Sequence, residues 1–406
     1  MNTTGPSAQS LHHPHLVIGA GPAGLVAAAS IARAGGSVHV VDRGAEVGHR
    51  FSGDFQGLEN WSTSQDVLEW LRVLGVEPDF EFHPFHEVTF YDHRLDATVA
   101  RGGSGPLFYL IRRGPMDGSL DRALLDQARA AGATVEFGTL SRQARRGEVV
   151  ATGPRYADGL VTGFVFSTSL ENQARCIISD RLAPAGYAYL LSWNGRATLA
   201  TCLFRRHHDW RTVRNETVDA FCRLVPGLRA ELDDDRPFSG YGSVFPAPRY
   251  TDEGGRLYIG EAAGIQDPEW GFGLRFAIES GALAAQSLLD GLHYRALASA
   301  AFERRIRTQF ANRMLFEALP EAAVRALLRR GAASNDLRRR LHRHWKPTRT
   351  KSLLARATRR RFSKTRLAHR DLACHLDSCD CLWCSHRQDH ASSIDDPAAG
   401  TDDDRS

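Results

Sequence analysis

The chain has 406 residues, of which 42% are hydrophobic and 24% are charged. These proportions are ordinary for a globular protein, and they exclude a fibrous or largely disordered chain. No uncharged apolar run approaches the roughly 18 to 20 residues needed to span a bilayer, and the first fifteen residues lack the apolar core of a signal peptide. We therefore expect a cytoplasmic protein without membrane-spanning helices.

The formal net charge of +4 conceals an uneven distribution along the chain. Residues 329–370 contain sixteen Lys or Arg and one acid, Asp336, so the rest of the chain is net negative. A basic segment of this kind suits an anionic surface, such as the inner face of a membrane, whereas nucleic acid is the less favoured partner. The alternative is a helix whose charges are only solvated. The sequence leaves the oligomeric state open.

The N-terminal residues predict a strand, a helix and a second strand in succession. The strand covers His15–Ile18, the Ala-rich helix covers 22–34, and the second strand covers 37–41. This order is typical of a βαβ unit in a parallel sheet. Residues 50–61 are rich in glycine and aromatic side chains, which predicts a loop, and the apolar spacing over 64–74 predicts a helix.

Short alternating patterns dominate the middle of the chain and predict antiparallel strands. Helical spacing returns at 117–131 and again towards the C-terminus. The predicted fold class is therefore α/β, with a Rossmann-type domain, an interleaved antiparallel β-rich layer for substrate, and a C-terminal helical basic tail. Strands are expected within 87–111 and at 134–137, 160–166, 174–179, 186–192, 197–204 and 257–260, and later helices at 273–289 and 298–319.

Residues 19–24 read Gly-Ala-Gly-Pro-Ala-Gly, which is the G-x-G-x-x-G pattern. The pattern follows a predicted strand, opens a predicted helix, and is followed by Asp42 at the end of the next strand, as in dinucleotide-binding folds. Gly19 would form the tight turn, Gly21 would let the backbone approach a pyrophosphate, and Gly24 would allow close packing of helix on strand. The helix N-terminus would bind the anion, and Asp42 would accept hydrogen bonds from a ribose.

Residues 19–43 resemble the FAD-binding start of the p-hydroxybenzoate hydroxylase-like flavoproteins. Two further segments resemble that family in order and spacing: Arg113-Gly-Pro-Met-Asp117 before a helix, and Gly260-Glu-Ala-Ala-Gly264 followed by Pro268 and two glycines. The resemblance implies FAD as cofactor, with Glu261 in the place of the family's usual Asp at the ribitol. The cofactor-binding residues it implies are Gly19, Gly21, Pro22, Ala23, Gly24, Asp42, Arg43, Arg113, Glu261, Gly271, Phe272 and Gly273.

Within that superfamily the chain most resembles the geranylgeranyl reductase family. The segment Ala185-Gly-Tyr-Ala-Tyr189 is similar to that family's "GYAW" strand, and Glu279-Ser-Gly281 lies in a similar Ala-rich helix. The hydroxylase motif "ADG..S..R" is present only as Ala157-Asp-Gly159, without the Ser and Arg that should follow.

The function expected from this resemblance is that of an FAD-dependent oxidoreductase. It would reduce a carbon–carbon double bond of an isoprenoid or lipid-like substrate by hydride transfer from reduced FAD. The first alternative is an FAD-dependent monooxygenase of aromatic or lipid substrates, and the second is a flavin-binding regulatory or nucleic-acid-binding protein without catalysis. NAD(P)H is a candidate electron donor, although the sequence contains no second G-x-G-x-x-G in a strand–helix context.

Aromatic residues near the expected flavin are candidates for the substrate pocket, and we select Phe55, Trp61 and Trp270. A flavin carries out the redox step itself, so the protein must position the substrate, exclude water and move protons. His49, His83 and His86 are possible proton donors by residue type, and the sequence selects none of them.

The C-terminal segment contains four closely spaced cysteines, Cys374, Cys379, Cys381 and Cys384. Thiolates at this spacing could hold Zn, and redox-active thiols or an unligated tail are the alternatives. The expected organisation is a disordered segment (1–14), an FAD-binding fold (15–320) with a β-rich substrate domain inserted at about 80–115 and 155–250, a basic helical segment (321–370), a Cys-rich knuckle (371–388) and an acidic disordered tail (389–406).

Overall fold

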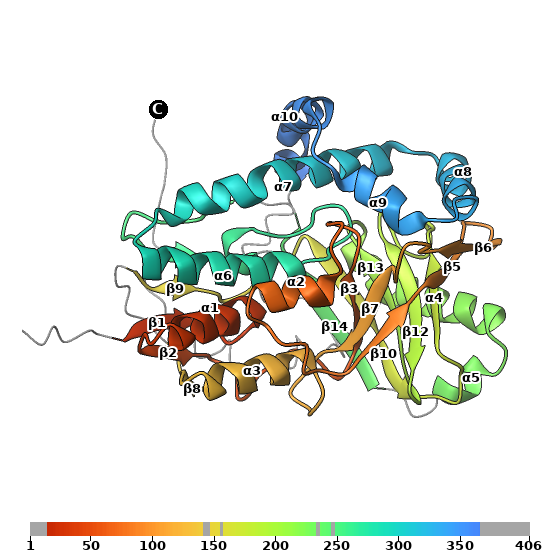
Figure 1. The fold of residues 1–406 in the computed structure, drawn as a ribbon. Helices are drawn as coiled ribbons and strands as arrows, with labels where there is room; N and C mark the ends of the chain where they lie inside the picture. The colour runs from red at the N-terminus through yellow and green to blue at the C-terminus, as the bar shows by residue number, and fades with distance from the viewer. Residues whose placement is uncertain (1–13, 141–146, 155–156, 233–235, 245–247, 366–406) are drawn as a thin grey trace, which may run out of the picture.

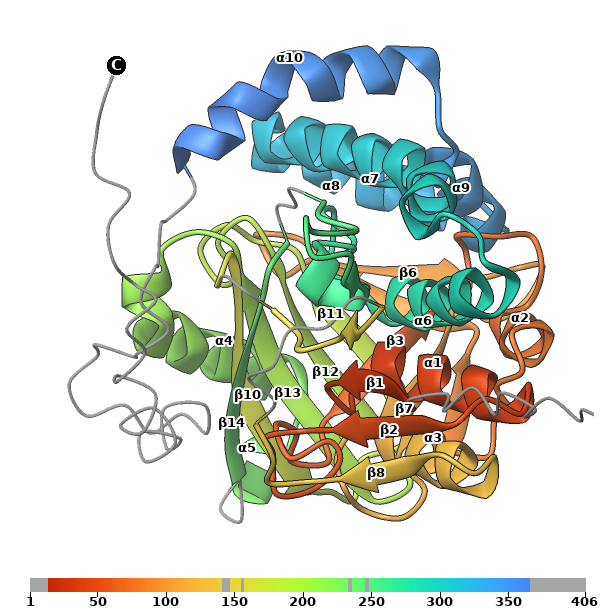
Figure 2. The same ribbon diagram turned by 90° about the vertical axis from the view of Figure 1, so that its left-hand side faces the viewer.

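The computed structural model describes residues 14–365, apart from 141–146, 155–156, 233–235 and 245–247. These residues form three sheets and a set of helices (Figure 1). A parallel sheet lies at one end of the molecule, a large antiparallel sheet lies at the other, and the C-terminal helices form a layer that covers one side of both (Figures 1 and 2). This arrangement matches the predicted fold class.

The parallel sheet has five strands in the order β15-β9-β1-β2-β8, and all of its pairings are parallel. Helix α1 (Pro22–Arg33) buries eight residues, most of them small, and packs closely against α6 (Leu274–Asp290) and α3 (Leu120–Ala130). The predicted strand–helix–strand unit is confirmed. The strands are β1 (His15–Ile18), β2 (Val38–Val41), β8 (Thr134–Glu136), β9 (Val149–Val150) and β15 (Leu257–Tyr258).

The large sheet has seven strands in the order β14-β10-β13-β12-β11-β5-β6. Every pairing is antiparallel except that of β11 with β5. Helix α4 (Trp210–Leu224), which the sequence reading did not foresee, packs on β13 and buries Phe221 against the sheet, followed by the short α5 (Leu228–Glu231). The strands are β5 (Glu87–Tyr91), β6 (Ala97–Arg101), β10 (Gly159–Ser167), β11 (Gln173–Ile177), β12 (Tyr187–Trp193), β13 (Arg196–Leu203) and β14 (Arg236–Gly242).

A third sheet of three strands, in the order β3-β7-β4, lies between the other two. Its strands are β3 (Phe55–Glu59), β7 (Phe108–Arg112) and β4 (Phe82–Phe85). The prediction of a loop over 50–61 is therefore wrong for its second half. Gly57 does not interrupt the strand, because antiparallel pairing with β7 supplies the backbone hydrogen bonds and stabilises the strand regardless of local propensity. Helix α2 (Val67–Val73) follows, as predicted.

In the part of the chain that the structure describes, four helices follow α6 and build the C-terminal layer: α7 (Tyr294–Ala318), α8 (Glu321–Ala332), α9 (Leu337–Trp345) and α10 (Arg349–Thr365). Both views show this layer as the outermost part of the molecule on one side (Figures 1 and 2). In α9 the apolar residues Leu337, Leu341 and Trp345 recur every four positions, so they share one face, and that face is turned towards the protein core. Within the described residues, no helix has the length and apolarity that a bilayer crossing requires.

Candidate functional site

A large cavity begins at the end of β1 and extends between the parallel and antiparallel sheets to the C-terminal helices. Its volume is about 940 Å³, and its lining is mostly apolar. The lining contains eleven of the twelve residues that the sequence predicts to bind the cofactor, and it also contains the three predicted substrate residues. The cavity thus brings together residues from positions 18 to 344. Gly24 is the predicted residue that does not line it, because Gly24 is buried inside the fold.

The glycine-rich loop joins β1 to α1. Gly19 has φ +110°, and a Cβ there would lie 2.4 Å from Ala151 O, while a Cβ on Gly24 would lie 2.0 Å from Gly19 O. Both glycines are therefore required by packing. Gly21 differs, because a Cβ there would meet no protein atom within 4 Å, and the residue lines the cavity. Gly21 caps the N-terminus of α1, and Pro22 is the first residue of the helix. Because the space beside Gly21 is open, a phosphate could lie against this helix N-terminus.

Asp42 follows β2 and lines the cavity, and its carboxylate also holds the glycine-rich loop in place. Its carboxylate accepts hydrogen bonds from Ala20 N at 2.6 Å and from Gly44 N at 2.7 Å. Each oxygen retains a further lone pair, so the predicted contact with a ribose hydroxyl is compatible with this arrangement and stays a prediction. Arg43 is the exposed neighbour at the rim of the cavity.

Arg113 lies after β7, buried at the cavity wall. Its guanidinium makes two hydrogen bonds of 2.8 Å to the Asp121 carboxylate and donates to Gln56 Oε1 at 2.9 Å. It also lies over the ring of Phe51, with 4.0 Å between Cζ and the ring centroid. The Asp121 carboxylate compensates the buried positive charge of Arg113 and fixes the orientation of its guanidinium. A bound cofactor would therefore meet a planar guanidinium in a fixed position.

Glu261 lies in the 3-10 turn η3 (Gly260–Ala263), directly after β15. Its Oε1 accepts a hydrogen bond from Ser243 N at 2.7 Å. Burial raises the pKa of this carboxyl to about 7, and the nearby positive charge of Arg50 opposes the rise. Glu261 lines the same cavity as the glycine-rich loop, so its carboxyl is a candidate to accept a hydrogen bond from a polyol, which remains a prediction for the ribitol.

The turn before α6 is folded around one buried carboxylate. Asp267 accepts hydrogen bonds from the backbone N–H groups of Glu269, Trp270 and Phe272 at 2.9, 3.0 and 3.2 Å. Burial, and then the charge of Glu269, raise the pKa of Asp267 to about 8. Gly271 has φ +83°, which favours glycine at the bend. The turn places Trp270 and Phe272 in the cavity lining.

Gly273 precedes α6 as its cap residue, as predicted, and lines the cavity. A Cβ on Gly273 would lie 1.9 Å from Gln266 Oε1, so the absence of a side chain lets the Gln266 amide lie against the helix N-terminus. The N–H groups at this terminus carry partial positive charge, which would stabilise negative charge on a bound flavin.

The aromatic residues that the sequence selects for substrate contact lie on one side of the cavity. Trp61 makes edge-on contacts with Phe272 and with Trp345 of α9, at centroid distances of 5.1 and 5.8 Å. The ring of Tyr187 is parallel to that of Phe272, and its hydroxyl donates to Trp270 O at 3.1 Å. Phe55 also lines this cavity. These rings form an apolar wall in which Trp61 connects the flavin turn to the C-terminal layer.

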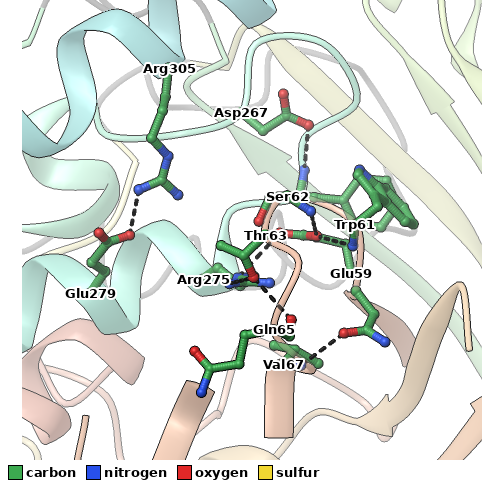
Figure 3. A network of polar contacts seen from close by, with 12 residues as sticks. Glu59, Trp61, Ser62, Thr63, Gln65, Val67, Asp267, Arg275, Glu279 and Arg305 are labelled. Atoms are coloured by element: carbon green, nitrogen blue, oxygen red, sulfur yellow. Dashed lines mark hydrogen bonds and ion pairs between the residues drawn. The ribbon is translucent and has the colours of Figure 1, made fainter. Parts of the chain in front are cut away.

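A buried ion pair fixes the loop that carries Trp61 (Figure 3). The Glu59 carboxylate accepts hydrogen bonds from Trp61 N and Ser62 N and lies 3.4 Å from the guanidinium of Arg275, at the start of α6. Arg275 also donates to Thr63 Oγ1 at 2.9 Å. Because α6 begins at the flavin turn, the pair couples the position of Trp61 to that turn.

Several polar residues that line the cavity were not predicted from the sequence. Tyr187 and Tyr189 alternate along β12 and both face the cavity, together with Cys202 of the neighbouring strand. Burial raises the pKa of both phenols well above their ordinary value, and raises the pKa of the Cys202 thiol to about 12, so all three groups stay protonated near neutral pH. The period-two pattern in YAYLL was visible in the sequence and could have identified the two tyrosines.

The far end of the cavity lies among the C-terminal helices, and none of its residues there was predicted from the sequence to belong to the site. His344 of α9 hydrogen-bonds to the Glu269 carboxylate at 2.7 Å, and Asn312 of α7 donates to the same carboxylate at 2.9 Å. Beyond this polar group most of the lining is apolar, with Arg340 of α9 beside it. The apolar residues from α7, α8 and the linker between them are Leu315, Phe316, Leu319, Val324, Leu327 and Leu328. Contacts between segments so distant in sequence leave no local signal.

Other predicted candidates lie away from this arrangement. His49 lines the cavity, whereas His83 stacks on Trp193 at a centroid distance of 5.7 Å, and neither it nor His86 lines the cavity. Cys374, Cys379, Cys381 and Cys384 lie outside the described residues, so the metal prediction is untested. Within the described part of the chain, no group of three or more His, Cys, Asp or Glu residues is arranged to hold a metal ion.

Comparison with known proteins identifies the class. Residues 13–153 match the family described as FAD binding domain. The fold is similar to that of a geranylgeranyl bacteriochlorophyll reductase-like protein from Thermoplasma acidophilum, with a TM-score of 0.62, 17% identity, and coverage of 85% of this chain and 96% of that one. A search of curated proteins finds no match.

Two further structures share the fold. A flavoprotein/dehydrogenase from Cytophaga hutchinsonii has a TM-score of 0.62 at 16% identity and covers 82% of this chain and 92% of its own. The p-nitrophenol 4-monooxygenase of Pseudomonas putida has a TM-score of 0.58 at 14% identity and covers 83% of this chain and 99% of its own. The chain thus has an N-terminal FAD binding domain over residues 13–153. The whole fold is shared with flavoproteins of differing activity, and the glycine-rich loop of the FAD binding domain opens to the cavity.

Proposed function

We propose that the protein reduces a carbon–carbon double bond in a long isoprenoid or lipid-like substrate. The observation that carries the proposal is the form of the cavity. It continues past the flavin turn, between aromatic walls, to an apolar end among α7, α8 and α9. A compact aromatic substrate would leave that end unused, whereas an extended hydrocarbon chain would fill it. The similar fold of a reductase-like protein supports the proposal.

FAD, when bound, would supply hydride to one carbon of the double bond, and the second carbon then needs a proton. Tyr187, Tyr189 and Cys202 line the cavity and carry a proton at neutral pH, so their position makes them the candidate donors, although burial makes all three weaker acids. The pair of His344 with Glu269 is a further group able to deliver or replace a proton from the solvent side. The buried aromatic walls would exclude water from the reacting atoms.

NADH or NADPH is the proposed electron donor, and it would act without a nucleotide domain of its own. The alternative activity is monooxygenation, which the similar fold of the nitrophenol monooxygenase favours. The two activities share the cofactor and differ in their use of oxygen. Oxygen dependence of the product therefore separates them.

The test uses the FAD-loaded protein reduced with NADH or NADPH under anaerobic conditions. Addition of a polyprenyl lipid should reoxidise the flavin without oxygen and yield a product two hydrogens heavier. If reoxidation requires oxygen and yields a hydroxylated product, the reductase proposal is wrong.

A variant tests the far end of the cavity. Leu319→Trp should fill that end, slowing reoxidation by a long-chain lipid at least tenfold while leaving a short-chain analogue unaffected. Leu289→Trp is the matched control, because Leu289 is exposed on α6 and does not line the cavity. Equal rates with long and short chains in Leu319→Trp would mean that the substrate does not reach the C-terminal helices.

A further inference from the structure

Basic side chains gather on the outer layer of C-terminal helices. The described residues 321–357 contain eleven Lys or Arg and only two acids, and eight of the eleven basic residues are exposed. Helix α9 alone carries Arg339, Arg340 and Arg343 on its exposed surface, while its apolar face packs inward. The rest of the chain is net negative, and α8, α9 and α10, which carry the basic residues, lie together in the outer layer on one side of the molecule (Figures 1 and 2).

The same layer exposes large apolar side chains at the end of the cavity. Leu315 of α7 is 50% exposed and Leu327 of α8 is 51% exposed, and both also line the cavity. Residues that are at once cavity lining and solvent-exposed mark an opening. Arg340 and His344 of α9 line the same end. The apolar cavity therefore opens on the side that carries these basic residues, between leucines and next to arginines.

We infer that this side of the molecule docks on an anionic lipid bilayer and that the cavity opens into the membrane surface. Arginines on α8, α9 and α10 would contact lipid phosphates, and Leu315 and Leu327 would enter the acyl boundary. Nucleic acid would match the charge, but it would leave the exposed leucines and the adjoining apolar opening without a role. The docking surface is a property of the helical layer and does not depend on which reaction the flavin site performs.

The experiment is co-sedimentation of the full FAD-loaded chain with vesicles of phosphatidylcholine alone and with 30% phosphatidylglycerol. We expect binding only to the anionic vesicles, weakening as salt rises. Each Arg near an anionic surface contributes roughly a fivefold factor in partitioning. Arg339→Glu/Arg340→Glu/Arg343→Glu should therefore lower the partition coefficient by at least about 100-fold.

The control for charge is Arg129→Glu/Arg196→Glu/Arg223→Glu, which changes the net charge equally at exposed positions outside the helical layer. It should retain at least half of the wild-type partition coefficient. Leu315→Ser/Leu327→Ser should reduce binding several-fold, whereas Val73→Ser/Leu289→Ser, at other exposed positions, should leave it unchanged. Flavin absorbance of each variant shows that the fold is intact.

Three results would overturn the inference. The first is an absence of sedimentation with anionic vesicles at low salt. The second is an equal loss in the charge variant and its control, which would indicate diffuse attraction instead of a docking surface. The third is binding to a DNA duplex that excess anionic vesicles do not displace, which would assign the surface to nucleic acid.

Discussion

Substituting Ala at two glycines of the phosphate loop should separate cofactor binding from folding. Gly21 has φ −78° and ψ 176°, which Ala adopts freely, and its Cβ would meet no protein atom within 4 Å. Gly21→Ala should therefore leave the stability of the FAD-free protein within about 1 kcal/mol of wild type, because the gain through the unfolded state is opposed by the poorer capping of α1 by Ala. The added methyl group projects into the cavity, where it would hold the pyrophosphate away from the start of α1.

The loss of affinity follows from the hydrogen bonds that the helix terminus would make. Hydrogen bonds to charged groups contribute about 1.5–3 kcal/mol each, and about 1.4 kcal/mol corresponds to a tenfold change in Kd. Displacing the pyrophosphate from one such N–H should raise the Kd for FAD by roughly 10- to 100-fold. Titration of the FAD-free protein, followed by quenching of flavin fluorescence, measures this change.

Gly24→Ala should behave differently, because its Cβ would lie 2.0 Å from Gly19 O and 3.2 Å from Ala151 Cβ. Helix α1 would have to move away from β1, at a cost of at least about 1–3 kcal/mol in the free energy of unfolding. Gly254→Ala is the control, since Gly254 lies outside the cavity and its Cβ would approach Asp252 no closer than 3.4 Å. Unchanged FAD affinity in Gly21→Ala would refute the placement of the pyrophosphate at this loop.

Further predictions concern buried charge, pH and the C-terminal cysteines. Arg113→Met leaves the Asp121 carboxylate buried without its cation, so urea unfolding should show that the free energy of unfolding falls by about 3–5 kcal/mol. The control is Arg122→Met in the exposed Arg122–Asp126 pair, which should cost about 0.5 kcal/mol or less. Equal losses in the two variants would contradict this prediction. Because the pKa of Glu261 is raised to about 7 in the folded protein, the folded state binds more protons than the unfolded state between pH 4.5 and 7. The contribution of Glu261 to the stability of the FAD-free protein should therefore fall across that range by up to about 1.4 kcal/mol per pH unit. Asp267, whose pKa is raised to about 8, adds a fall over the same range, so Glu261→Gln should make the slope shallower without removing it; an unchanged slope in the variant would contradict the raised pKa of Glu261. If the C-terminal cysteines hold Zn, elemental analysis should find it in the full chain, and Cys381→Ser should lower the content; absence of metal from protein purified without chelators would refute the site.

The cofactor half of the site was predictable because its chemistry depends on local backbone geometry. Gly19, Gly21 and Asp42 lie within one strand–helix–strand unit, where spacing in sequence determines position in space. The turn at Gly271 and Gly273 was likewise visible, since glycine marks a backbone with positive φ at Gly271 and a position without room for a side chain at Gly273.

The substrate half depends on contacts that no short segment encodes. Residues 50–61 were predicted to form a loop because the segment is rich in glycine and aromatic side chains, yet antiparallel pairing with β7 makes residues 55–59 the strand β3. Leu319 and His344 reach the cavity only because α7 and α9 fold back over both sheets. The basic composition of that segment was evident in the sequence, whereas its place at the cavity opening was not.

The most direct test of the central claim is the visible spectrum of the purified protein, before and after anaerobic addition of NADH or NADPH. We expect flavin absorbance bands that correspond to about one FAD bound per chain, and we expect a reduced nicotinamide to bleach these bands in the wild type. In Gly21→Ala the bands should be weak. A colourless protein that takes up no added FAD would contradict the assignment of the glycine-rich loop and its cavity to a flavin.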